Sequence, residues 1–300
     1  MLKVLHWLLM KATLVPRVCA IFVTRNPQPT FVSNVSSVAE LVGRIVVVDN
    51  ASSSEAQQFL LKLHRQGCEI IRNNTNLGIA VALNQGIRIA LAAGYDWVAT
   101  FDQDSRASEG FILQMLETYQ KASDAERIAI VAPTYVDREL GLRSPLLRAS
   151  NGEILAAMTS GSLMPANAIR RLGMFDESLY MDYVDIEYCL RARQQGMLIV
   201  QSPTILYHSL GRITTHRLLG RAFATTNHSA GRRYYITRNR LRMLVRYMAD
   251  WRWAWREIKA ILFEAFKIAL VEENKWTKFQ AMMAGTADAL RGRTGMQIEL

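Results

Sequence analysis

The alternation of buried strands with amphipathic helices along the first hundred residues constrains the fold of this chain more than any other feature. Runs of apolar, β-branched residues predict buried strands over Val18–Thr24, Arg44–Asp49, Cys68–Arg72 and Asp96–Asp102. Helical patterns fill the intervals, over Phe31–Leu41, Glu55–Gln66 and Ile79–Ala93. Strands that alternate with helices at this spacing build a parallel, doubly wound sheet. We therefore predict an α/β fold in which helices flank a mostly parallel sheet.

The second half of the chain has a more mixed pattern. It predicts a helix over Asp182–Gln195 and strands over Met158–Met164, Met197–Gln201 and Ile205–His208. From about Arg217 onward only helical patterns remain, over Gly231–Met248, Arg252–Val271 and Glu273–Leu290. We expect strands to stop near His208. The chain then divides into an amphipathic N-terminal extension (residues 1–16), an α/β domain (17–214) and a helical C-terminal region (215–300).

The positive charge of the chain is concentrated in its C-terminal part. The formal net charge is +10, and residues 205–300 supply all of it, with 17 Lys and Arg against 7 Asp and Glu. A basic tail on a neutral body indicates an anionic partner, either phospholipid, nucleic acid or a polyphosphate. Trp251, Trp253 and Trp255 stand beside Arg252 and Arg256 in this tail. This pattern is typical of a membrane-interface anchor, and equally of a helix that packs on the body or in a dimer.

Two further features bear on localisation. No stretch reaches the ~20 uninterrupted apolar residues that a spanning helix needs. Cys19, Cys68 and Cys189 are scattered and odd in number, which favours a reducing compartment over a disulfide framework. We expect a cytoplasmic protein, peripheral on the inner face of the cell membrane. The sequence leaves open whether the chain forms a homo-oligomer.

Polar residues gather at the expected carboxyl ends of strands, where doubly wound sheets bind ligands. Asp102 and Asp104 follow a buried strand, and two carboxylates at this spacing can share one Mg²⁺ or Mn²⁺. An acidic turn that caps the next helix is the simpler explanation, but the position after three βα units favours a metal site. Asp49 closes the second strand. Its carboxylate could accept the imide N–H of uracil or thymine, or belong to an ordinary turn.

Five carboxylates crowd residues 176–187, namely Asp176, Glu177, Asp182, Asp185 and Glu187. Acidic residues stabilise a helix N-terminus, and Asp182 fits a cap. Crowding also raises the pKa of one member, which suits a general base. His208 ends a strand and taken alone is more typical of a structural histidine. A basic aromatic cluster could bind sugars or nucleic acid and consists of Arg232, Arg233, Tyr234, Tyr235, Arg238 and Arg240.

These residues lie in motifs that resemble the inverting glycosyltransferases of family two, which have the GT-A fold. The resemblance runs from about Val18 to Gly211. Its first half rests on FVTRNP, IVVVDNASSS, NNTNLGIAVALNQGI and TFDQDS, and its second half on TSGSLM, GMFDESLYMDYVDIEYCLRARQQG and YHSLG. It implies a GT-A, Rossmann-like domain with a nucleotide-binding half (17–105) and an acceptor half (106–214). One position departs from the family, because Arg25 stands where an aromatic residue usually precedes the Asn of the first loop.

The resemblance also implies a role for each matching residue. The residues implied around the nucleotide are Thr24, Asn26, Asn76, Gly78 and Asp102, with Asp49 on the pyrimidine. The implied ligands of a Mn²⁺ or Mg²⁺ cofactor are Asp102, Asp104 and His208. Asp185 becomes the catalytic base, with Ser160, Gly161, Asp182 and Glu187 on the acceptor side. The implied partners are a nucleotide-sugar donor and a saccharide or lipid-linked saccharide acceptor.

The segments FDQDS, MDYVDIEYCLRAR and RRYYITRNRLRMLVRY are most similar to bacterial rhamnosyltransferases of polysaccharide and O-antigen assembly, which implies dTDP-L-rhamnose as donor. The alternative is another nucleotide sugar, such as UDP-galactose, UDP-galactofuranose or UDP-glucose. A nucleotidyltransferase or a dehydrogenase is disfavoured because TRNPQPTF has no glycine for a phosphate loop. Nucleic acid is not an expected partner, because the acidic stretch 176–187 would repel phosphate backbones.

Overall fold

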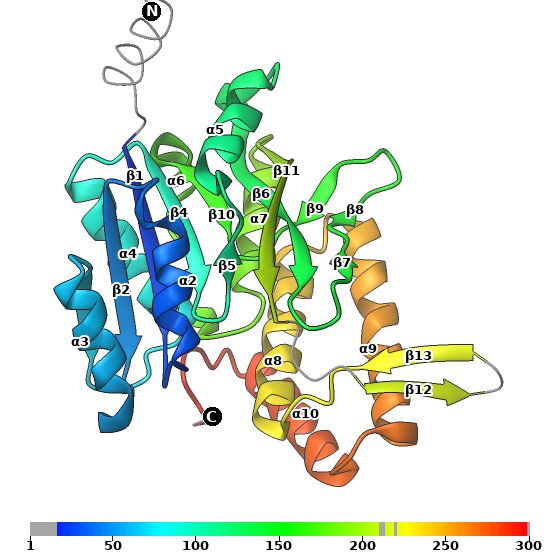
Figure 1. Ribbon diagram of the computed structural model, residues 1–300. Coiled ribbons are helices and arrows are strands. Elements are labelled where there is room, and N and C mark those ends of the chain that lie inside the picture. The colour runs from blue at the N-terminus through cyan, green and yellow to red at the C-terminus, as the bar shows by residue number, and fades with distance from the viewer. Residues whose placement is uncertain (1–16, 210–213, 219–220, 299–300) are drawn as a thin grey trace, which may run out of the picture.

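The computed structural model describes residues 17–209, 214–218 and 221–298. One central sheet has helices on both faces, and the C-terminal helices gather at one end of it (Figure 1). This arrangement confirms the expected mostly parallel α/β fold with a C-terminal helical extension. The N-terminal extension that we expect over residues 1–16 lies outside the described residues.

The first half of the chain folds as the strand and helix patterns predict. Its four strands are β1 (Val18–Thr24), β2 (Arg44–Asn50), β3 (Glu69–Asn73) and β4 (Trp97–Asp102). Its helices are α2 (Thr30–Ala39), the short η1 (Ser54–Ala56), α3 (Gln57–Arg65) and α4 (Ile79–Ala92). Each strand lies within one residue of its expected bounds, and each helix within two.

The second half departs further from the sequence expectation. Its strands are β5 (Arg106–Ala107), β6 (Ile128–Asp137), β7 (Arg143–Ser144), β8 (Leu147–Arg148), β9 (Ile154–Ala156), β10 (Ser162–Pro165) and β11 (Leu198–His208). Its helices are α5 (Phe111–Lys121), η2 (Ala125–Arg127), α6 (Ala166–Leu172), η3 (Glu177–Leu179) and α7 (Val184–Gln194). The two strands expected at 197–208 are one strand with a register shift between Gln201 and Ile205. The strand expected over Met158–Met164 begins only at Ser162.

The sheet brings the polar strand ends to one edge. Its strand order is β3-β2-β1-β4-β10-β6-β11-β5, and β7 pairs with β6. β1, β2, β3 and β4 run parallel, as do β6 and β11, whereas β10 is antiparallel to β4 and β6. In the register, Thr24 pairs with Asp49, and Val23 with Asp102. Because parallel strands end on the same side, these residues share the carboxyl edge of the sheet.

The expectation that strands stop near His208 is wrong. β12 (Thr214–Leu218) and β13 (Arg221–Thr225) form an antiparallel hairpin across the expected domain boundary. The segments TTHRL and RAFAT lie two residues apart, which is the spacing of a tight hairpin. Three helices follow as expected: α8 (Ala230–Arg246), α9 (Trp251–Val271) and α10 (Lys275–Leu290). Among the described residues, no helix is both long and apolar enough to cross a membrane.

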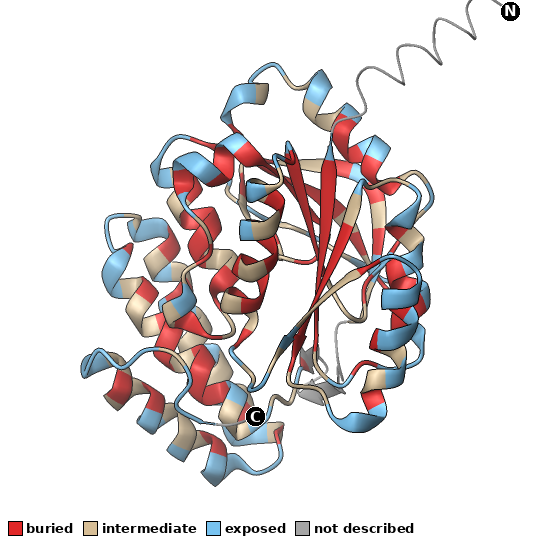
Figure 2. Ribbon diagram, turned by 90° about the vertical axis from the view of Figure 1, so that its left-hand side faces the viewer, coloured by how far each residue is buried: buried red, intermediate tan, exposed pale blue. Residues whose placement is uncertain are grey.

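The sheet is buried on both faces and forms a rigid platform. Every residue of β1 is buried, and the central strands are red along their length in Figure 2. Neighbouring residues of a strand point to opposite faces. Thus Ile21 packs with Leu83 and Ile87 of α4 on one face, whereas Phe22 packs with Phe31 and Phe111 on the other. Such packing on both sides holds the carboxyl edge of the sheet in place for the site described next.

Candidate functional site

Two adjoining cavities lie at the carboxyl edge of the sheet. The strand-edge cavity has a volume of about 310 Å³, and its polar lining residues are Thr24, Arg25, Asn50, Asn76, Asp102 and Gln103. The carboxylate cavity has a volume of about 550 Å³, and its charged lining residues include Asp102, Asp182, Asp185, Arg232, Glu264 and Lys267. Asp102 and Met181 line both cavities. A ligand that occupies both would therefore pass Asp102.

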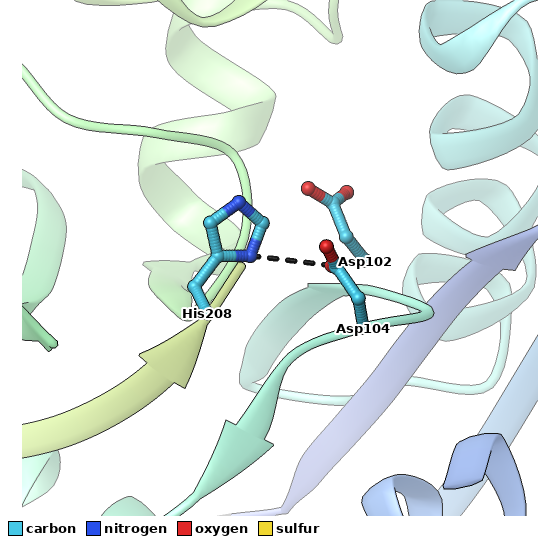
Figure 3. Close-up of side chains that lie close together, drawn as sticks. All are labelled: Asp102, Asp104 and His208. Carbon is cyan, nitrogen blue, oxygen red and sulfur yellow. Dashed lines mark ion pairs between the residues drawn. The ribbon is translucent and has the colours of Figure 1, made fainter. Parts of the chain in front are cut away.

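Asp102, Asp104 and His208 form a compact group of possible metal ligands between the cavities. Asp102 ends β4, Asp104 lies in the turn after it, and His208 ends β11, so the fold joins residues more than a hundred positions apart. One donor atom from each lies within 4.8 Å of the others, and His208 Nδ1 is 3.2 Å from Asp104 Oδ1. The three side chains converge in Figure 3. Two carboxylates and an imidazole are a donor set that Mn²⁺ and Mg²⁺ accept.

The electrostatics of this group favour a cation. Burial raises the pKa of Asp102 to about 6, although His208 lowers it, and the neighbouring Asp104 raises it further. Burial alone would lower the pKa of His208, but the hydrogen bond and charge of Asp104 raise it overall. Carboxylates that crowd one another in a partly buried site are stabilised by any positive charge placed between them. The residues present therefore fit a divalent cation.

The hydroxyl groups of Ser160 and Ser105 form a chain of hydrogen bonds between Asp102 and His208. Ser160 Oγ accepts a hydrogen bond from the Asp102 amide at 3.0 Å and lies 2.7 Å from Ser105 Oγ. Ser105 Oγ lies 2.8 Å from His208 Nδ1. Ser160 is thus buried beneath the group rather than in the wall of the carboxylate cavity. Gly161 lies beside it at φ +76°, where an added Cβ would come within 2.7 Å of Leu206.

Asp185 lies in the first turn of α7 and lines the carboxylate cavity. Its Oδ1 accepts a hydrogen bond from the Ile186 amide at 2.8 Å. Burial raises the pKa of Asp185 to about 6, the bond from Ile186 opposes this, and the nearby Asp182 adds to it. A carboxylate that is ionised at neutral pH but unusually basic is suited to accept a proton.

The turn before Asp185 is strained and is clamped by α8. Tyr180, Asp182 and Tyr183 all have positive φ, and Tyr180 at φ 66°, ψ −67° forms a tight γ-turn. The expected helix start at Asp182 is therefore displaced to Val184. The buried Asn239 amide donates to the backbone carbonyls of three turn residues, Leu179, Met181 and Asp182, at 2.7–3.0 Å.

This turn also reaches the first half of the chain. Tyr180 packs against Gly78, where an added Cβ would lie 2.5 Å from both its ring and its carbonyl oxygen. The Tyr180 carbonyl accepts a hydrogen bond from the Ile79 amide at 2.8 Å. The close approach requires glycine at position 78, whose φ is +85°. Gly78 therefore allows the turn before Asp185 to pack against the first half of the chain.

The remaining acidic residues of the cluster have different surroundings. Asp182 lines the carboxylate cavity and forms a forked ion pair with Arg232, with contacts of 3.0 and 3.2 Å. Glu187 is fully buried outside the cavities, where Arg191 and Tyr247 each donate to it at 2.8 Å. Its contacts are those of an ion-paired core residue. Only Asp182 and Asp185 of the crowded stretch face the carboxylate cavity.

The first-half residues are divided between the strand-edge cavity and its supporting loop. Thr24, Asn76 and Gly78 line the cavity, and Thr24 Oγ1 donates to Gln103 Oε1 at 2.7 Å. Asn26 lies in the supporting loop, where its Oδ1 accepts from the Ser53 amide at 2.8 Å. Asp49 is buried next to the cavity, and its Oδ1 accepts from the Ser52 hydroxyl and amide. Asp49 therefore lies at the carboxyl edge of the sheet, as expected, but not among the residues that line the strand-edge cavity.

The basic aromatic cluster is mostly a structural core rather than an open binding surface. Tyr234, Tyr235, Arg233, Arg238 and Arg240 are buried, and Arg238 donates to the carbonyls of Gly295 and Leu179. Arg233 and Arg240 pair with acidic residues of the C-terminal region. The rings of Tyr234 and Tyr235 are buried and cannot stack on a ligand, whereas Arg232, Arg233 and Arg240 line the carboxylate cavity, so a role of the cluster in sugar binding stays a prediction. The cluster joins α8 to the turn that carries Asp182.

Sequence reasoning overlooked several residues that shape the site. Gln103, Ser105 and Asn239 were not singled out, although each contacts a cavity wall or its support. Gln103 and Ser105 alternate with the two aspartates of FDQDS, so the motif could have indicated that they lie close to the possible metal ligands. No local pattern marks Asn239, since its partners lie about sixty residues away.

Comparisons with known proteins bear on the family of this chain. The model of the family described as "Glycosyl transferase family 2" matches residues 19–177. A dTDP-rhamnosyl transferase, RfbF of Shigella flexneri, is 29% identical over 293 residues, covering 92% of this chain and 96% of the relative. The galactofuranosyltransferase GlfT1 of Mycolicibacterium smegmatis is 24% identical over 74% of this chain and 81% of its own length.

Solved structures share the fold at low identity. GalNAc-T7 with UDP, GalNAc and Mn²⁺ superposes with a TM-score of 0.55 at 15% identity, over 76% of this chain and 47% of that one. This chain therefore spans about half the length of that protein. S. aureus TarS 1-349 with UDP-GlcNAc gives a TM-score of 0.53 at 13% identity, over 92% of this chain and 73% of that one. These likenesses confirm the expected GT-A fold.

Proposed function

This chain belongs to glycosyl transferase family 2, and on that premise we propose that it transfers L-rhamnose from dTDP-L-rhamnose to a saccharide acceptor, with inversion at the anomeric carbon, in the synthesis of a bacterial cell-surface polysaccharide. One observation carries the proposal. Asp102 lies between a cavity of nucleotide-binding character and a cavity that contains Asp185. The similarity to RfbF supports the choice of donor sugar.

The strand-edge cavity would hold the nucleotide. Thr24, Asn76 and Gly78 line it, Asn26 supports its loop, and Asp102 would face the ribose. Asp49 would read the imide of the pyrimidine after a local rearrangement of its contacts with Ser52. In this proposal residues 17–105 form the nucleotide half and residues 106–214 the acceptor half.

Asp102, Asp104 and His208 would hold Mn²⁺ or Mg²⁺ at the junction of the cavities. When bound there, a divalent cation supplies positive charge that stabilises the departing diphosphate. The protein's own part is to fix the ligands, which the Ser160–Ser105 hydroxyl chain supports.

Asp185 would act as general base on the acceptor. It would take the proton from an acceptor hydroxyl while that oxygen bonds to the anomeric carbon of the donor. The bond from the anomeric carbon to the diphosphate oxygen breaks with its electron pair, and the nucleoside diphosphate leaves. A single displacement inverts the configuration and needs no nucleophile from the protein. Asp182, held by Arg232, would contact the acceptor in the same cavity.

The acceptor and surroundings complete the proposal. The acceptor is a saccharide or a lipid-linked saccharide, and the basic C-terminal region (215–300) holds the enzyme at the inner face of the cell membrane. Glu187, Ser160 and Gly161, which the family resemblance implies on the acceptor side, would act by supporting the cavity, given their burial.

A donor panel tests the proposal. Release of nucleoside diphosphate would be measured with Mn²⁺ and a saccharide acceptor for dTDP-L-rhamnose, UDP-galactose, UDP-galactofuranose and UDP-glucose. We expect dTDP-L-rhamnose to give the highest kcat/KM, and UDP or dTDP to inhibit more strongly than GDP or ADP. A higher kcat/KM with a UDP-sugar would replace rhamnose by that sugar, whereas stronger inhibition by GDP would contradict the role of Asp49.

A further inference from the structure

Helix α9 presents a wide, largely apolar face to solvent. Seven large side chains on it are exposed: Trp251, Trp255, Ile258, Leu262, Phe263, Phe266 and Leu270. Leu262 and Trp251 are 67% and 66% exposed, whereas Trp253 is 3% exposed on the opposite side of the helix. At ~100° per residue, the seven residues fall within an arc of about 140°. In Figure 1 the helix runs along the right-hand side of the molecule, and the β12–β13 hairpin extends farther to the right.

The charges of α9 are segregated around this face. Its two acidic residues, Glu257 and Glu264, turn toward α8, where both pair with Arg240. Arg252 and Lys259 are exposed within the same arc of the helix, over the rings of Trp251 and Trp255 at 5.6 and 5.4 Å from the ring centroids. The outward surface of α9 is therefore apolar, aromatic and basic.

We propose that this outward face of α9 is a membrane-docking surface, which inserts its apolar residues among the lipids of an anionic bilayer while Arg252 and Lys259 bind the headgroup phosphates. A helix whose outward face combines large apolar side chains, tryptophans and long basic side chains is suited to lie in the plane of the interface. The inference deepens the proposed function and rests on it, since it specifies which surface holds the enzyme at the membrane.

Charge complementarity favours a bilayer over a second copy of this chain. A two-fold symmetric contact between two such faces would place Arg252 and Lys259 of each copy near the same residues of the other, or near apolar surface. Like charges across an interface are unfavourable. An anionic lipid surface offers opposite charge along the whole length of the helix.

The outward face of α9 lies beside the carboxylate cavity. Glu264 and Lys267 of α9 line the carboxylate cavity, and Lys267 lies over the ring of Phe263 at 5.0 Å from its centroid. Lys267 thus marks the border between the apolar face and the cavity. Docking through α9 would hold the cavity with Asp185 next to the lipid surface, where a saccharide carried by a membrane lipid would be within reach.

Vesicle binding tests the proposal without donor or turnover. The full chain would be sedimented with vesicles of phosphatidylglycerol and phosphatidylcholine in equal parts, and with phosphatidylcholine alone. We expect binding to the anionic vesicles that weakens as salt is raised, and at least tenfold weaker binding for the double variant Leu262→Glu, Phe266→Glu. The control Leu61→Glu changes an equally exposed leucine on α3 and should bind like the wild type.

Thermal melting checks that both variants remain folded, and light scattering reports their oligomeric state. Equal binding of the double variant and the wild type to anionic vesicles would overturn the proposal. So would a wild type that binds neither vesicle but forms a dimer that the double variant dissociates. Nucleoside diphosphate release, measured separately on a water-soluble saccharide, should be unchanged in the double variant. If neither the wild type nor the variants release nucleoside diphosphate, the proposed function is contradicted, but the vesicle-binding result still stands.

Discussion

Replacing Asp185 by Asn should separate catalysis from stability in one substitution. Asn keeps the shape of the side chain and its acceptor oxygen for the Ile186 amide, but it cannot take a proton from an acceptor hydroxyl. Loss of a general base costs about 10²–10⁴-fold in rate. We therefore expect kcat to fall in that range, whereas donor affinity stays close to that of the wild type because the strand-edge cavity is untouched.

The same substitution should stabilise the fold in the absence of ligands. Burial raises the pKa of Asp185 from 3.8 to about 6. Each unit corresponds to about 1.4 kcal/mol, so keeping this carboxylate ionised in the folded state costs about 3 kcal/mol at neutral pH. Between about pH 4 and pH 6 the folded protein holds a proton that the unfolded chain has lost. The contribution of Asp185 to the free energy of unfolding therefore falls as pH rises through this window, and the Asn variant lacks that fall.

The assay compares Asp185→Asn with Asp182→Asn in turnover, donor binding and thermal melting. Asp182→Asn removes the ionic partner of Arg232 but leaves Asp185 in place, so it should retain measurable turnover. The wild-type rate should also fall as pH drops below about 6, since the base must be ionised to act. A fully active Asp185→Asn variant, or an inactive Asp182→Asn beside it, would show that we have assigned the wrong carboxylate.

Three further perturbations test the surroundings of the base. Excess chelator should abolish nucleoside diphosphate release and added Mn²⁺ or Mg²⁺ should restore it, because we propose that Asp102, Asp104 and His208 hold the cation. Full activity in chelator would refute that site. Ser105→Ala should free His208 to rotate and so weaken Mn²⁺ binding by about 10–100-fold in calorimetry. The control Ser108→Ala removes a hydroxyl that contacts Thr204 instead and should leave Mn²⁺ affinity unchanged. Equal Mn²⁺ affinity of the two variants would contradict the positioning role of Ser105. Asn239→Ala removes a donor from three turn carbonyls, of which Leu179 keeps its bond from Arg238, so we expect a lower melting temperature and a lower kcat at nearly constant donor KM. An unchanged kcat would show that the turn does not need Asn239.

The fold of the first half could be predicted because its information is local. The apolar run of β1 and the helical pattern that follows Gly78 each specify one element without help from distant residues. The hairpin of β12 and β13 was missed because its strands are only five residues long and carry charged residues. β6 was overlooked although its segment, IAIVAPTYVD, is almost wholly buried.

The site was predictable only where a motif carried it. Asp102 and Asp104 stand two residues apart in one motif, and the family resemblance, not the residues alone, selected Asp185 from its acidic run. The burial of Arg238 was not foreseeable, because the carbonyls that accept its hydrogen bonds come from residues 57 and 59 positions away. Glu187 looked like its neighbours in sequence, but helix geometry turns it toward Arg191 and Tyr247 and away from the cavity.

The anomeric configuration of the product tests the central claim most directly. The NMR spectrum of the saccharide formed from dTDP-L-rhamnose and an acceptor would be recorded early in the reaction, with Mn²⁺ present. A single displacement assisted by Asp185 predicts a new linkage of the configuration opposite to that of the donor. A linkage that retains the donor configuration would contradict it, because retention requires a second displacement or attack from the same face as the leaving group.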